Sequence, residues 1–186
     1  MTWLIVGLIF FFGAHLQKRL IPSLRQRLVD RLGEKGCKGI IALISAVGLT
    51  LIVLGFRYGG FIPLYDLGSS GLLLNNLAMM LAVAFLGLGY SKSRLRKYVR
   101  HPMLLSVIFW SIGHLLVNGD LKSVILFLSF GLWSFLEIRL TNSSTPSVQS
   151  FTKGSLKGDI GLVVIATLAY FTISVVHLYL GVFPFY

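Results

Sequence analysis

The stretch "RHPMLLSVIFWSIGHLLVNGDL" (residues 100–121) decides how the rest of the chain is interpreted. From Pro102 to Val117 it carries no charged side chain, yet a histidine, His114, interrupts it, and a second one, His101, stands directly before it. A run of this kind is typical of a helix buried in a membrane. Because ionisable side chains at membrane depth are rare and usually functional, the histidines are the first candidates for a site.

The composition of the whole chain agrees with a membrane environment. Of its 186 residues 55% are hydrophobic and only 12% are charged, and the mean hydropathy is +0.83. These values exclude an ordinary soluble domain and are typical of an integral membrane protein. A single cysteine, Cys37, excludes an internal disulfide, a CxxC metal site and a CxxCH haem attachment site.

Apolar runs recur along the chain and predict its membrane spans. They cover residues 3–16, 39–56, 72–90, 103–117, 124–136 and 160–183. A full crossing takes about 20 residues, so the first, fourth and fifth runs cross only if their flanks are also helical. We therefore predict an all-α, polytopic membrane protein with six transmembrane helices, forming a single domain over residues 1–186. The fourth and fifth helices are expected to form a hairpin over residues 117–122, where Gly119 supplies turn chemistry.

The basic residues predict the orientation. Every lysine and arginine except Arg57 and Lys122 falls in the first, third or fifth loop. The positive-inside rule places these loops in the cytoplasm and both termini outside it, in the cytoplasmic (inner) membrane. The formal net charge of +11 is therefore mainly a topology signal. Besides the bilayer itself, the expected partners are anionic lipid headgroups at the cytoplasmic loops, not nucleic acid.

Two of these loops have patterns of their own. In the first loop, residues 17–38, leucine or valine recurs at helical spacing at positions 24, 28, 29 and 32, with basic residues between. This pattern predicts an amphipathic helix on the cytoplasmic membrane surface, ended by Gly33 and Gly36. The fifth loop, residues 141–159, is rich in serine and threonine and predicts a polar, mobile linker whose role the sequence does not indicate.

The two histidines of the opening stretch cannot share one task. They are 13 residues apart, which puts them roughly 140° apart around a helix. Pro102 suits the first helical position, so His101 is expected to be the cap residue of that helix. The free amides at this helix end, beside Arg100, predict an anion site for a lipid phosphate or a cofactor carboxylate.

His114 and a histidine of the first run, His15, have similar surroundings. His114 shares a helix face with Trp110 and Ser111, and His15 ends the segment "LIFFFGAH". An imidazole flanked by aromatic residues and glycine, on each of two helices, is what a haem between helices requires. Side chains lean toward the N-terminus of their own helix, so both rings lean toward the bilayer centre. The alternative for each ring is an ordinary hydrogen bond, and we favour that alternative for His177.

Three segments together resemble a known family. "GAHLQKRLIPSLRQRLVDRLGEKGCKGIIALISAVGLTLIV", the opening stretch and "FLEIR" resemble the NnrU family of bacterial membrane proteins, over about residues 4–139. That family is named for its association with nitrite and nitric oxide reductase genes, and is similar to the plant zeta-carotene isomerase, a membrane haem protein. The resemblance implies haem b bound by His15, in "GAHLQKRL", and by His114, in "WSIGH". The isomerase has a cysteine three residues before the second histidine, where this chain has Ser111, so a thiolate ligand switch is not carried over.

The short motif "RHPM" also resembles the cofactor-binding turn of the isoprenylcysteine carboxyl methyltransferases, which use S-adenosylmethionine. The later segment "FLEIRLTNSSTPSVQSF" keeps Glu137 and Arg139 but lacks the rest of the pattern of those enzymes. Three hypotheses therefore stand. The first is a haem-b protein in redox or nitric-oxide and denitrification-related metabolism, with haem-dependent isomerisation as one option. The second is a methyltransferase-like protein, and the third is a non-catalytic accessory protein, so the sequence leaves open whether the protein is an enzyme.

Overall fold

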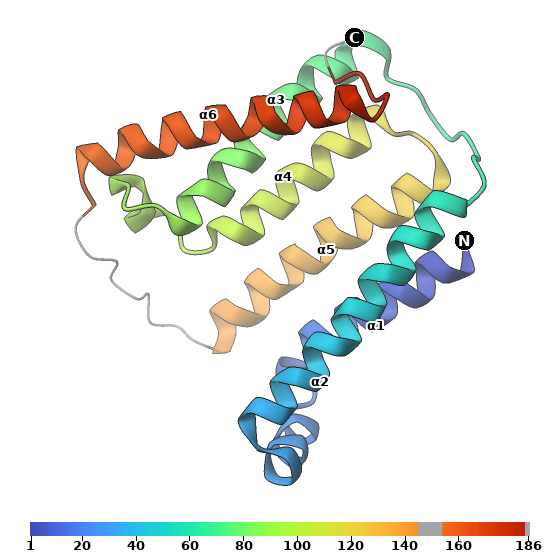
Figure 1. Cartoon of the computed structure of the whole chain (residues 1–186), viewed down its shortest axis with the longest axis vertical. Coiled ribbons are helices and arrows are strands. Elements are labelled where there is room, and N and C mark those ends of the chain that lie inside the picture. Colours follow the sequence, from blue (N-terminus) through green and yellow to red (C-terminus); the bar gives the residue numbers. More distant parts are fainter. Residues whose placement is uncertain (145–153, 185–186) are drawn as a thin grey trace. The chain divides into compact units, whose positions relative to one another are not determined.

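The computed structural model describes residues 1–144 and 154–184, and the regular structure of these residues is helical, as predicted (Figure 1). The elements in chain order are α1 (Thr2–Leu20), α2 (Pro22–Tyr58), α3 (Gly68–Tyr90), the short 3-10 helix η1 (Arg94–Tyr98), α4 (Pro102–Val117), α5 (Leu121–Ser144) and α6 (Leu156–Tyr179).

In the described part of the chain, five helices are long and apolar enough to cross a bilayer: α1, α2, α3, α5 and α6. α1 and α5 reach this length because their flanks are helical, which was the condition for a crossing. α4 has 16 residues and measures about 24 Å, against about 30 Å of hydrocarbon. The chain is therefore a multi-pass membrane protein, and the sixth crossing stays a prediction.

The surface of the helices suits lipid. On α6, for example, the exposed fractions of Val163, Ile165 and Leu168 are 64%, 65% and 63%. Continuous apolar surface of this kind is rare on proteins that live in water, because it drives association. The helices therefore present side chains that acyl chains can cover.

The chain divides into two compact units, which we describe separately. The first comprises Met1–Pro63 with Asp120–Leu126, and the second comprises Leu64–Gly119 with Phe127–Tyr186. In the first unit α1 and α2 pack antiparallel, with glycines where the backbones meet. A Cβ atom added at Gly48 would lie 2.8 Å from the Phe11 amide nitrogen and 3.0 Å from the Gly7 carbonyl oxygen, so only glycine fits. Small residues let membrane helices approach this closely.

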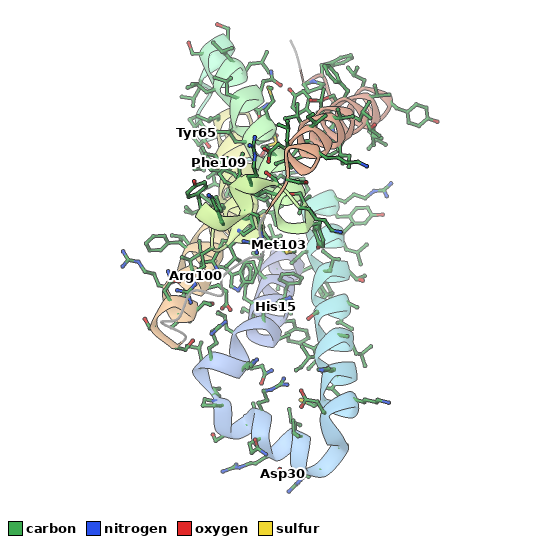
Figure 2. All side chains as sticks on the ribbon, turned by 90° about the vertical axis from the view of Figure 1, so that its left-hand side faces the viewer. His15, Asp30, Tyr65, Arg100, Met103 and Phe109 are labelled. Atoms are coloured by element: carbon green, nitrogen blue, oxygen red, sulfur yellow. The ribbon has the colours of Figure 1, made fainter. Side chains whose placement is uncertain are left out.

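α2 contains a sharp kink at Gly33, whose φ of 70° is open to glycine and strained for other residues. The break agrees with the predicted end of the amphipathic segment at Gly33, whereas Gly36 lies within the helix. Asp30 lies in the bend just before the kink (Figure 2). Shortly after it, the Cys37 side chain is completely buried (0% exposed), with its sulfur 4.0 Å from the Arg25 guanidinium. The location of the segment on a membrane surface stays a prediction.

In the second unit α3 packs against both α4 and α6. The Tyr170 hydroxyl of α6 donates to the Asn76 side chain of α3 (2.8 Å). The predicted hairpin between α4 and α5 is present, and its turn is held by the preceding loop. The Leu64 and Tyr65 amides donate to the Gly119 carbonyl (2.7 and 3.1 Å), and a Cβ atom at Gly119 would overlap the Tyr65 carbonyl.

The start of α6 is tied to the loop before α4. The Asp159 carboxylate accepts hydrogen bonds from the Ser93 hydroxyl (2.7 Å), the Arg94 amide (2.7 Å) and the Arg94 side chain (2.5 Å). Glycines at 154 and 158 let the two backbones touch, because a Cβ atom at either position would overlap residues 92–94. One carboxylate thus anchors this loop to α6.

Two sequence-based boundaries were wrong. The linker predicted over 141–159 is helical at both ends, because 141–144 continue α5 and 156–159 begin α6; its middle, 145–153, lies outside the described residues. The last span was predicted to reach residue 183, but α6 ends at Tyr179. The reason is Gly181, which adopts a φ of 79° and thereby lets Val182 donate to the His177 carbonyl (2.9 Å), a glycine-dependent helix stop.

Candidate functional site

His114 lies on the side of α4 that faces α5. Its neighbour Gly113 faces α3 instead, where a Cβ atom would lie 3.1 Å from the Asn75 side-chain oxygen. The His114 ring stacks on Phe127 of α5, with ring centroids 4.4 Å apart and planes 23° apart. The Trp110 ring lies 5.0 Å from the imidazole and 4.9 Å from the Phe127 ring, so the three rings form one cluster. The sequence pattern predicted the Trp110 contact but not the Phe127 contact.

The hydrogen bond of this ring fixes its tautomer. The His114 Nδ1 atom lies 3.0 Å from the Trp110 carbonyl oxygen. A carbonyl only accepts, so Nδ1 must carry a proton, and in the neutral ring Nε2 then carries the lone pair. A histidine that binds a metal through Nε2 needs this tautomer, and its ring is commonly oriented by a bond from Nδ1 to a carbonyl.

His15 repeats this arrangement on α1. Its Nδ1 atom lies 2.7 Å from the Phe11 carbonyl oxygen, and its ring is 4.3 Å from the Phe11 ring, inclined by 30°. Figure 2 shows where His15 lies on α1. His15 belongs to the first unit and His114 to the second. That both bind one iron therefore stays a prediction.

His177 on α6 has the same hydrogen bond but different surroundings. Its Nδ1 atom lies 2.8 Å from the Ile173 carbonyl oxygen, which is the ordinary bond that the sequence favoured for it. Among the described residues it has no aromatic ring contact, unlike His15 and His114. It lies within electrostatic range of His114 in the second unit. Each ring thus makes the same hydrogen bond through Nδ1, so aromatic contact, not this hydrogen bond, separates the three histidines.

Ser111 also faces α5 and is almost fully buried (2% exposed). A Cβ atom at Gly131 would lie 3.3 Å from the Ser111 Cβ, so the serine packs on the α5 backbone. Within the described residues its hydroxyl has no hydrogen-bond partner. The serine therefore sits one turn before His114 on the same side of α4, while its role toward a cofactor stays a prediction.

The "RHP" turn has the predicted backbone. His101 is the N-cap residue of α4 and Pro102 begins the helix. The His101 Nε2 atom lies 2.8 Å from the Asn142 side-chain oxygen on α5, so this imidazole is engaged within the protein. Sequence reasoning missed this partner because it assigned Asn142 to a linker. The predicted anion site at Arg100 and His101 (Figure 2 labels Arg100) stays a prediction.

Among the described residues, no three histidine, cysteine, aspartate or glutamate side chains gather as a metal-binding group. A metal ion held by protein donors alone usually needs three or four of them. A haem iron needs only axial ligands from the protein, because the porphyrin supplies the rest.

A cavity of about 250 Å³ lies in the first unit, between α1 and α2. Gly13 and Gln17 line it, and at about 100° per residue both lie on the side of α1 opposite to His15. Drug-sized ligands occupy pockets of about 300–1,000 Å³. The cavity is thus too small for a porphyrin and faces away from the candidate ligand.

The family model described as "NnrU protein" matches residues 3–184, nearly the whole chain. The chain belongs to the NnrU family. The match to the NnrU family continues past residue 139, where the resemblance read from the sequence ended, and includes α6. Neither a curated protein nor a solved structure gives a significant match.

Proposed function

We propose that this NnrU-family protein binds haem b, with His15 and His114 as the two axial ligands, and that it acts in redox or nitric-oxide and denitrification-related metabolism. The observation that carries the proposal is the hydrogen bond that each of the two imidazole rings makes through Nδ1. Each donates its Nδ1 proton to the carbonyl four residues earlier, and this is the tautomer that a histidine needs to bind iron through Nε2.

The residues around each ring fit a flat apolar group. Phe11 accompanies His15, and Phe127 and Trp110 accompany His114. Aromatic side chains offer large, rigid apolar faces at a low entropic cost. The chain's own contribution is to hold the two ring nitrogens in one tautomer, to exclude water and to provide these faces. The haem, when bound, would supply redox chemistry.

The proposal assigns Arg100 and His101 to the carboxylates of the haem, at the cytoplasmic end of α4. The His101 ring also bonds to Asn142 on α5. Arginine suits this task because its planar fork binds a carboxylate with two parallel hydrogen bonds. Isomerase activity remains one option within this proposal, and Ser111 cannot supply the thiolate of the plant enzyme.

The proposal is tested by the absorption spectrum of the full chain, expressed with adequate haem and purified in detergent. We expect a Soret band in the wild type and its loss in His114→Ala and in His15→Ala, because each variant removes one axial nitrogen. His177→Ala is the matched control, since it has the same hydrogen bond without the aromatic neighbours. It is expected to keep the band.

The other results have distinct meanings. A wild-type protein without a Soret band overturns haem binding, and heat released on titration with S-adenosylmethionine would then favour the methyltransferase-like alternative. Loss of the band in His177→Ala, with the band intact in His15→Ala, would overturn the ligand assignment and move the second ligand to α6.

We also propose that the protein lies in the cytoplasmic membrane with both termini outside the cytoplasm. The support is the distribution of basic residues, with only Arg57 and Lys122 on the opposite side. Anionic lipid headgroups are the partners that this arrangement favours at the cytoplasmic loops.

A further inference from the structure

The cavity between α1 and α2 lies beside the predicted cytoplasmic end of the first unit. Phe10 and Gly13 of α1 and Ile41 of α2 form part of its wall. Leu24 and Leu28, from the amphipathic segment before the Gly33 kink, complete it. The apolar positions that the sequence assigned to the membrane surface thus also close a cavity against the two membrane helices.

Gly13 leaves room inside this wall. A Cβ atom added at Gly13 would meet nothing within 4 Å, in contrast to the crowded glycines between α1 and α2. Close packing therefore does not explain the glycine at this position. The space beside it is open to a ligand.

Water is a poor occupant of this space. The wall offers one polar side chain, Gln17, whose buried Oε1 atom has no hydrogen-bond partner within the described residues. An ordered water needs about two to four polar partners. The cavity is partly open to its surroundings, and apolar walls that touch no atoms lose dispersion contacts. In a membrane the abundant apolar molecule that fills such a space is an acyl chain.

The charges around the cavity select among lipids. In the first cytoplasmic loop, Glu34 pairs with Arg25 (2.8 Å) and with Lys38 (3.7 Å). Four further basic residues have no acidic partner in the described part of the chain: Lys18, Arg27, Arg31 and Lys35. Lys18 lies on the same side of α1 as the lining residue Ala14, four residues earlier, and Arg27 lies three residues after the lining residue Leu24. Positive charges without an acidic partner therefore flank the lining residues along both helical segments.

We propose that this cavity is a binding site for an anionic phospholipid. One acyl chain fills the space beside Gly13, and Lys18 and Arg27 hold the phosphate. At about 30 Å³ for a group the size of a water molecule, the cavity of about 250 Å³ takes a segment of a single chain. The site is independent of haem, so it can be tested whether or not haem is bound.

The test is native mass spectrometry of the full chain after reconstitution with a mixture of phosphatidylglycerol and phosphatidylcholine and a detergent wash. We expect the wild type to retain phosphatidylglycerol in preference to phosphatidylcholine, and Gly13→Leu to lose it, because the leucine side chain fills the cavity. Gly161→Leu on α6 is the matched control. It is also a helical glycine with nothing within 4 Å of an added Cβ, and it should retain the lipid.

A second pair of variants keeps the test decisive if Gly13→Leu fails to fold. Lys18→Gln with Arg27→Gln should abolish the preference for phosphatidylglycerol, whereas Arg57→Gln, at the other end of α2, should preserve it. Equal retention of both lipids by the wild type overturns the proposal, as does retention by Gly13→Leu at the wild-type level. Binding of glycerol 3-phosphate with the same affinity as the lipid would show that the headgroup alone is recognised and would overturn the role of the cavity.

Discussion

Ser123 and Ser134 lie on the same helix, α5, and both are almost completely buried (1% and 0% exposed). They differ in their hydrogen bonds. The Ser123 hydroxyl and amide both donate to the Asp120 carboxylate, which caps the start of the helix. The Ser134 hydroxyl has no partner among the described residues. Substitutions at the two serines therefore measure two different quantities. One is the stability gained from a hydrogen bond, and the other is the stability lost when a buried hydroxyl has no partner.

We expect Ser123→Ala to lower the free energy of unfolding by about 0.5–1.5 kcal/mol, the net value of a typical hydrogen bond. Ser134→Ala should leave stability unchanged or raise it, because a buried hydroxyl without a partner costs about 1–3 kcal/mol. Thermal unfolding in the same detergent measures both. A larger loss in Ser134→Ala than in Ser123→Ala would show that Ser134 has a partner, such as water, that its protein surroundings do not reveal.

For single residues, the sequence predicted the place of a residue on its own helix better than its contacts with other helices. The cap role of His101 followed from Pro102, and the aromatic flank of His114 followed partly from Trp110 at helical spacing. Phe127 and Asn142 could not be predicted, because contacts between α4 and α5 depend on the rotation of each helix about its own axis. Nothing in one sequence determines that rotation when polar residues are scarce on every face.

Among the elements, α1 and α2 show how backbone contact can hold two apolar helices together. Gly7, Gly48 and Gly55 lie where the chains cross, and a Cβ atom at Gly7 would lie 2.6 Å from the Ile52 amide nitrogen. In a bilayer apolar side chains gain little by leaving lipid, so helix pairs depend on close packing. The hairpin should therefore tolerate changes on its outer surface and resist any at these glycines.

We expect Gly48→Leu to destabilise the protein by at least about 1–3 kcal/mol, the usual cost of overpacking. Gly39→Leu is the matched control on the same helix, because a Cβ atom there meets nothing within 4 Å. It should be neutral or stabilising by up to about 1 kcal/mol, since leucine favours helix more than glycine does. Thermal unfolding of both variants decides the matter, and equal stability of the two would contradict the close approach.

Helix existence was predictable and helix ends were not. Each predicted apolar run falls on one of the α-helices of the described residues, because burial in lipid demands such a run, whereas the short helix η1 has no apolar run and was not predicted. It placed the ends of α1 and α5 too early, since polar residues such as Gln17 and Asn142 continue a helix readily once it leaves the hydrocarbon. At α6 the error had the opposite sign, because the apolar residues after Tyr179 remain hydrophobic while Gly181 stops the helix.

For the whole molecule, the number of crossings depends on α4. With 16 residues this helix falls short of the hydrocarbon by about 6 Å, a mismatch that local thinning of the bilayer or snorkelling flanks can absorb. Whether the number of crossings is even or odd determines on which side of the membrane each terminus lies. Six crossings place both termini on one side, whereas five place them on opposite sides.

We expect both termini to lie outside the cytoplasm. Alkaline phosphatase fused to the C-terminus should therefore be active, and green fluorescent protein at the same position should be dark. A fusion in the first loop, after Asp30, serves as the control and should give the reverse pattern. Termini that report opposite sides would show that α4 does not cross.

Cys37 gives the molecule a further chemical property. It is the only cysteine of the chain, and its side chain is completely buried. Oxidation and nitrosation require a thiolate that the reagent can reach. A protein with its single thiol enclosed in this way forms no intermolecular disulfide in air and offers reactive nitrogen species no target on that atom. The Cys37 thiol can therefore stay unmodified in surroundings that modify the exposed thiols of neighbouring proteins.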